Sequence, residues 1–285
     1  MVLRLLAKKL FRTVARVIPQ CGMVSQAVAF NMFLAFFPSL LVALGLMSRS
    51  LQGKSGQELA ARLADILPPG SWQLVSDFLA RREVNPWNWV LLGWLGTLLV
   101  GTQVMKLIME GICLIYGDRK RHSFLGRQIR GLLLFCVSIV AWLLAVVVSV
   151  FGRPVRQWMT RGVGQSLLAR DFWTVMLPVS AMVLAILVLA LIYRVARPST
   201  TTWISVLPGA TAATILWWSI NLLFSIYVRH MRYGPVYGGL AAAIGLMVWM
   251  EFSAMIVFVG AAWNAENAAV SQGISPLPPD RPRMS

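Results

Sequence analysis

Residue types that carry out catalysis are few in this chain and form no known catalytic pattern. The two histidines, His122 and His230, lie far apart in the sequence, and zinc-protease, serine-hydrolase and phosphate-loop motifs are absent from it. The cysteines lack the paired spacing of a zinc site or a disulfide framework; they are Cys21, Cys113 and Cys136. We therefore expect no enzymatic activity, no metal and no cofactor.

Ionisable residues inside apolar segments are better functional candidates, because a charge in a bilayer is costly and usually faces protein or water. Glu251 lies midway along an apolar segment, so we expect it to face a polar interior or a cavity. Lys106 and Glu110 are four residues apart and share one helical face. They can pair, or Lys106 can extend to the interface, and a structural role is favoured for both.

Amides and helix breaks complete the candidate set. Amides in apolar helices usually form hydrogen bonds between helices; here they are Gln26, Asn31 and Asn221. A proline inside a helix frees the carbonyl four residues earlier. The predicted breaks are Pro38, Pro178 and the pair Pro208-Gly209. Transporters use broken helices as binding sites, but a kink that only shapes the bundle is commoner.

These residues sit in six apolar segments, each long enough for a bilayer core of ~30 Å, which takes ~20 helical residues. The chain is 58% hydrophobic and 13% charged, against ~25% charged in a soluble domain. The segments are continuous rather than alternating, which indicates helices and not a barrel. We predict an all-α polytopic membrane protein with six transmembrane helices at about 24–48, 88–108, 131–151, 172–194, 203–227 and 236–262.

The predicted organisation has three parts. Residues 1–23 form a basic amphipathic segment, residues 24–265 form the transmembrane domain, and residues 266–285 form a disordered tail. Loop 49–87 is the one sizeable extramembrane element, and its apolar spacing predicts two short amphipathic helices. These helices either lie on the outer leaflet or cap a cavity between the spans.

Charge distribution predicts the orientation. Six spans place both termini on one side, and the dense basic clusters at 4–16 and 119–130 lie on that side. Because cytoplasmic loops are enriched in Lys and Arg, we expect both termini in the cytoplasm and loop 49–87 outside. The net charge of +16 fits headgroups at the membrane surface better than nucleic acid.

An ordered set of short motifs resembles the YihY/BrkB family of bacterial inner-membrane proteins, once mislabelled ribonuclease BN. The motifs in this chain are 27–38 (AVAFNMFLAFFP), Tyr193-Arg194 with Pro198, Pro208-Gly209-Ala210, Tyr237-Gly238-Gly239 with Trp249, and Gly260-Ala261 with Asn264-Ala265-Glu266. The chain departs from the family pattern at Ala262, where Glu is usual, and at Glu251, where an aromatic residue is usual. Positions 251 and 262 are close to three helical turns apart and share one face.

The resemblance implies a six-span protein of the bacterial inner membrane, linked to envelope integrity and, in one branch, to virulence through serum resistance. Our main expectation is a protein that moves or organises a lipid or amphipathic envelope component. The alternatives are a scaffold of an envelope complex and, disfavoured, a tRNA-processing ribonuclease using Glu110, Asp118 and Glu266. The expected partners are membrane lipids, with envelope proteins or a second copy as further options.

Overall fold

Six long helices make up the computed structural model, which describes residues 2–50, 86–117, 124–162, 167–197, 202–230 and 238–271. All six are long and apolar enough to cross a membrane, and the described residues contain no strand. The prediction of an all-α, six-span protein is confirmed. The helices are α1 (Val2–Ser50), α4 (Pro86–Tyr116), α5 (Phe124–Gly162), α6 (Leu167–Ala196), α7 (Trp203–His230) and α8 (Gly238–Ser271).

The helix ends differ from the predicted spans at both termini of the chain. The predicted basic segment 1–23 is helical and continues into the first span, since α1 is one helix from Val2. At the other end α8 continues to Ser271, beyond the predicted end at residue 262. Residues 51–85 of the predicted loop 49–87 and the tail beyond Ser271 lie outside the described residues, and α4 begins at Pro86.

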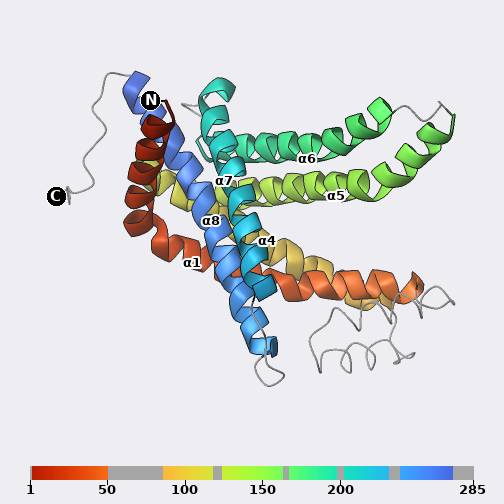
Figure 1. Ribbon diagram of the computed structural model, residues 1–285. Coiled ribbons are helices and arrows are strands. Elements are labelled where there is room, and N and C mark those ends of the chain that lie inside the picture. The colour runs from red at the N-terminus through yellow and green to blue at the C-terminus, as the bar shows by residue number, and fades with distance from the viewer. Residues whose placement is uncertain are drawn as a thin grey trace.

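A sharp turn in α1 divides it between two neighbours. Its first part runs beside the C-terminal half of α8, and its remainder runs along α4 (Figure 1). Two prolines, Pro19 and Pro38, lie inside α1. A proline removes one backbone hydrogen bond and clashes with the preceding turn, and prolines are a common cause of sharp bends in helices.

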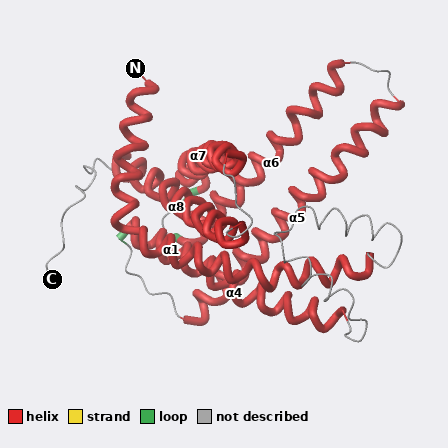
Figure 2. Tube along the Cα trace, turned by 60° about the horizontal axis from the view of Figure 1, so that its bottom comes forward, coloured by secondary structure: helices red, strands yellow, loops and turns green. Residues whose placement is uncertain are grey.

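The helices form a ring in chain order. Each helix packs against the next, and α8 packs against α1 to close the ring, while α4 also contacts α8 and α6 (Figure 2). The contacts place the start of α1, the end of α4, the end of α6, the start of α7 and the end of α8 together. We call this the terminal end of the bundle.

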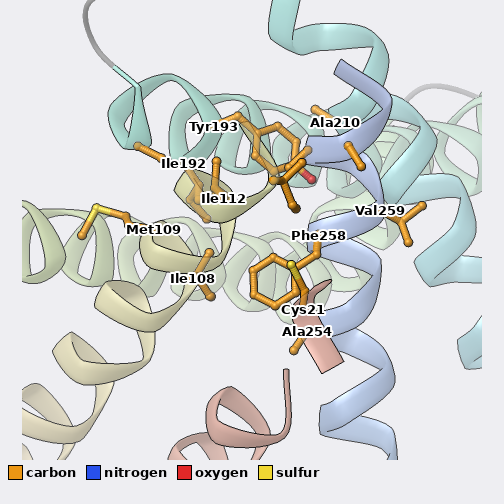
Figure 3. Close-up of a cluster of buried hydrophobic side chains, with 14 of the residues drawn as sticks. Cys21, Ile108, Met109, Ile112, Ile192, Tyr193, Ala210, Ala254, Phe258 and Val259 are labelled. Carbon is orange, nitrogen blue, oxygen red and sulfur yellow. The ribbon is translucent and has the colours of Figure 1, made fainter. Parts of the chain in front are cut away.

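The buried core is concentrated toward the terminal end. Its members come from the first part of α1, the last part of α4 and α6, the start of α7, the last part of α8 and, from α5, Leu134. Phe258 and Ile112 are fully buried there beside Cys21 (Figure 3). Large apolar side chains are exposed on the outer surface of all six helices, at the terminal end (Phe11, Ile204) as well as away from it.

One face of α8 shows this change along its length. Val259 and Ala262 are 3% and 0% exposed, whereas Ile244, Val248 and Phe252 on the same face are 54%, 39% and 49% exposed. These positions recur at multiples of a helical turn and form one stripe. We call it the α8 stripe: it is covered at the level of the core (Val259, Ala262) and exposed toward the start of α8, and Val270, which continues the same face in the last turn, is again 66% exposed.

Glycines allow the closest helix contacts. A Cβ atom at Gly93 of α4 would lie 2.7 Å from the carbonyl oxygen of Pro38, and one at Gly96 would lie 3.0 Å from the Pro38 Cβ. At Gly111 a Cβ would lie 2.4 Å from the ring of Phe258. Small residues at such positions let transmembrane helices approach closely. The resulting van der Waals contact replaces the hydrophobic effect, which does not drive helices together in lipid.

We predict that Gly93→Ala lowers the thermal unfolding temperature in detergent. The added methyl group meets backbone rather than a flexible side chain, and overpacking of this kind costs about 1–3 kcal/mol. Gly22→Ala is the matched control, because a Cβ there meets nothing within 4 Å. Its unfolding temperature should be equal or higher, as alanine is the better helix former. Equal losses in both variants would contradict the close contact of α1 with α4.

Candidate functional site

A side chain of α8 bonds the backbone of α7 on both sides of Pro208. Pro208 has no N–H, so the Ile204 carbonyl loses its helical partner. Next to it, the Asn264 side chain accepts a hydrogen bond from the Gly209 N–H at 2.7 Å. The same amide donates from Nδ2 to the Val206 carbonyl at 3.0 Å. Asn264 is buried, so this amide ties α8 to one donor and one acceptor of the α7 backbone next to Pro208, although not to the Ile204 carbonyl itself.

Glycines bring α7 and α8 into contact beside this amide. A Cβ at Gly209 would lie 2.1 Å from the Gly260 carbonyl oxygen, and one at Gly260 would lie 2.3 Å from the Tyr193 hydroxyl oxygen. Tyr193 of α6 is buried and donates its hydroxyl proton to the Val257 carbonyl at 2.8 Å (Figure 3). Three helices therefore meet around the break, and we call the cluster of Tyr193, Gly209, Gly260 and Asn264 the α6–α8 junction.

The sequence predicted the break at Pro208-Gly209 but not its partner. Asn264 was as visible in the sequence as the other amides, yet the predicted span ended at residue 262 and placed it outside the membrane helices. Because α8 continues through Ser271, Asn264 is inside the helix and faces α7. The junction unites residues from three of the motifs that carried the family resemblance.

Further from the terminal end, α7 and α8 exchange reciprocal hydrogen bonds. Trp249 of α8 donates its indole N–H to the Asn221 side-chain oxygen at 2.8 Å. Trp217 of α7 donates its indole N–H to the Ser253 hydroxyl at 3.2 Å. The two indole rings lie 6.5 Å apart. Asn221 thus forms the hydrogen bond between helices that the sequence predicted.

The other two predicted amides, Asn31 and Gln26, take no part in these hydrogen bonds between α7 and α8. Asn31 donates its side-chain N–H to the carbonyl of Ala27 in its own helix, at 2.8 Å. Gln26 is exposed on α1. The structure therefore does not gather Gln26, Asn31 and Asn221 into one polar site.

Glu251 lies on the opposite side of α8 from the Trp249 and Ser253 side chains, since two residues correspond to about 200° around a helix. Its side chain is half-buried, and it forms no hydrogen bond or ion pair with a described residue. Glu251 borders the α8 stripe close to Phe252, where the stripe leaves the core. The arrangement places one carboxylate beside an apolar surface that faces lipid.

Lys106 and Glu110 interact with α5 rather than with each other. The Lys106 ammonium donates to the Gln128 side-chain oxygen at 2.9 Å, and Glu110 lies 3.8 Å from the Arg127 guanidinium. Gly131 allows this approach, as a Cβ there would lie 2.9 Å from Lys106 Cγ. The two residues share a face as predicted, but that face is the contact with α5.

The predicted helix breaks have different surroundings. Pro38 packs on Gly93 and Gly96 of α4, so this break belongs to a close helix contact. Pro208 and Gly209 belong to the α6–α8 junction. Pro178 falls within the range of α6, but its side chain lies outside the described residues. Among the described residues no three His, Cys, Asp or Glu side chains gather in a way that could hold a metal ion.

The fold and these contacts define a polytopic α-helical membrane protein with a packed terminal end and a lipid-facing far half. The sequence profile of the family described as "Virulence factor BrkB" matches residues 19–283, and the chain belongs to this family.

Two relatives illustrate the similarity. The chain is 28% identical over 245 residues to the "Putative ribonuclease-like protein YfkH" of Bacillus subtilis, covering 85% of this chain and 88% of that protein. It is 34% identical over 76 residues to a "UPF0761 membrane protein" of Tolumonas auensis, covering 26% of this chain and 25% of that protein. No solved structure matches the chain.

We predict that Asn264→Leu destabilises the protein by about 1–3 kcal/mol for each polar group left without a partner. The Gly209 N–H and the Val206 carbonyl would both lose their bonds in a buried setting. Asn31→Leu is the matched control, because Asn31 bonds only within its own helix. Its unfolding free energy should change by less than about 0.5 kcal/mol. Thermal unfolding in detergent measures both, and equal stability of the two variants would show that the amide bridge is unimportant.

Proposed function

We propose that the protein resides in the bacterial inner membrane and moves or organises a lipid or an amphipathic envelope component. The observation that carries this proposal is the α8 stripe, which is covered at the level of the core and exposed toward the start of α8. An acyl chain could lie along the exposed part of this apolar face and would stop where the packed core covers it.

Glu251 supports the same proposal. A carboxylate at this depth is costly in lipid, so it persists where a cation, a proton or water can reach it. Its position on the border of the α8 stripe puts a carboxylate next to the apolar surface that would hold lipid acyl chains. Together they suit an amphiphile, whose apolar part contacts the stripe and whose polar part contacts Glu251.

A scaffold is the second candidate, and the dense core at the terminal end favours it. Helices that are joined by amide bridges and glycine contacts form a rigid body, which suits assembly with envelope proteins or a second copy. The two candidates differ in one measurable property, because only the first requires lipid to move or to be held at Glu251.

A ribonuclease is disfavoured, although the name of one relative contains that word. Of the carboxylates near the terminal end, Glu110 is paired with Arg127 and Glu266 is buried. Asp118 lies outside the described residues. A metal-assisted hydrolysis needs several ligands around an open position, and the described residues offer no such group.

For Glu251 we predict a charge-dependent effect on lipid movement in proteoliposomes. The wild-type protein should accelerate transfer of a fluorescent phospholipid between leaflets, measured with and without an imposed pH gradient. Glu251→Gln should slow transfer about tenfold, because a hydrogen bond to a charged group is worth ~1.5–3 kcal/mol. Glu110→Gln is the matched control and should transfer at the wild-type rate, since Glu110 lies on α4 against Arg127. Transfer no faster than in protein-free liposomes would reject movement and favour the scaffold.

We also expect both termini to be cytoplasmic, with residues 49–87 outside. Most of the basic residues of α1, together with Arg194 of α6, belong to the terminal end, which supports a cytoplasmic position for it. Single cysteines at Ser55 and Ser123, on a background without the native cysteines, test the orientation with an impermeant reagent on intact cells. Labelling at position 55 alone is expected, and labelling at position 123 alone would reverse the topology.

A further inference from the structure

Three basic side chains at the terminal end lie over aromatic rings. The Lys9 ammonium is 4.5 Å from the centre of the Trp263 ring. The Arg194 guanidinium carbon is 4.4 Å from the centre of the Trp203 ring, and that of Arg197 is 3.9 Å from the centre of the Tyr116 ring. The pairs join α1 to α8, α6 to α7 and α6 to α4, and we call them the cation–aromatic rim.

The rings fix the depth of the cations. Trp and Tyr favour the headgroup level of a bilayer, where the ring contacts apolar groups and its polar edge contacts water. A cation held over such a ring stays at that level instead of extending freely into the cytoplasm. Trp203 is 47% exposed, so the Arg194 pair is on the outer surface of the bundle.

Stacking on the Trp203 ring leaves the N–H donors of Arg194 available for a further partner. A guanidinium contacts a ring with its face, while its N–H groups point outward from its edge. Neither Arg194 nor Lys9 forms an ion pair with a described carboxylate, whereas Arg127 is paired with Glu110. Lys9 also donates to the Asn267 side chain, which holds it in place at the end of α8.

We propose that the cation–aromatic rim binds the phosphate headgroups of anionic phospholipids in the leaflet at the terminal end. Positive charge, fixed depth and outward donors match a phosphate at the membrane surface, and Arg is suited to phosphate oxygens by its planar fork. RNA is a poorer fit, because the cations are held at the level of the headgroups. This site is distinct from the α8 stripe, so it holds whether or not the protein moves lipid.

Lipid titration followed by native mass spectrometry tests the proposal with purified full-length protein in detergent. Arg194→Gln should weaken binding of phosphatidylglycerol about fivefold relative to phosphatidylcholine. Arg127→Gln makes the same charge change at a cation already paired with Glu110 and should alter binding less than about twofold. Equal losses in both variants would show a general attraction to positive charge and overturn the site.

A second pair of variants separates the ring from the charge. Trp203→Leu keeps the net charge but removes the ring under Arg194, so phosphatidylglycerol binding should weaken, and Trp203→Phe should retain most of it. Unchanged binding in Trp203→Leu would overturn the role of the rim. Added glycerol phosphate or a single-stranded RNA should not displace the lipid at equal concentration. Displacement by glycerol phosphate would indicate a soluble phosphate ligand, and displacement by RNA would indicate a nucleic-acid surface; either result rejects the lipid.

Discussion

Polar side chains that bond the backbone of a neighbouring helix are strong contacts inside a bilayer, and the packed end of the structure depends on one of them. The Asn264 amide bonds both the Gly209 N–H and the Val206 carbonyl, so a residue of α8 ties α8 to the start of α7 next to Pro208. The amide reaches the backbone because Gly209 and Gly260 carry no side chains between the helices. Tyr193 then attaches α6 to the same point through the Val257 carbonyl.

The turn in α1 divides its contacts between two neighbours, with the first part beside α8 (Figure 1). Beyond the turn α1 follows α4, where Pro38 rests on Gly93 and Gly96. The α8 stripe consequently passes from the core to the lipid without a change in its apolar character.

The two ends of the bundle therefore present different chemistry to the bilayer. The terminal end combines a dense core with the cation–aromatic rim, which suits anchoring among headgroups. The far half exposes apolar faces and the carboxylate of Glu251 beside them. Such a molecule could be anchored by its terminal end among the headgroups of one leaflet, while lipid acyl chains contact the exposed faces of its far half.

The sequence by itself determined the class of fold, the number of spans and the family, because continuous apolar length leaves helices as the only way to satisfy the backbone in lipid. It also indicated the hydrogen bond of Asn221 between helices, since an amide in an apolar helix needs a polar partner. Only the tertiary structure decided that Asn264 ties α8 to α7, that Lys106 and Glu110 contact α5, and that Glu251 stays apart from the amides. A sequence assigns each residue to a face of its own helix, but the helix that this face meets depends on the turn in α1 and on glycine contacts between residues far apart in the chain.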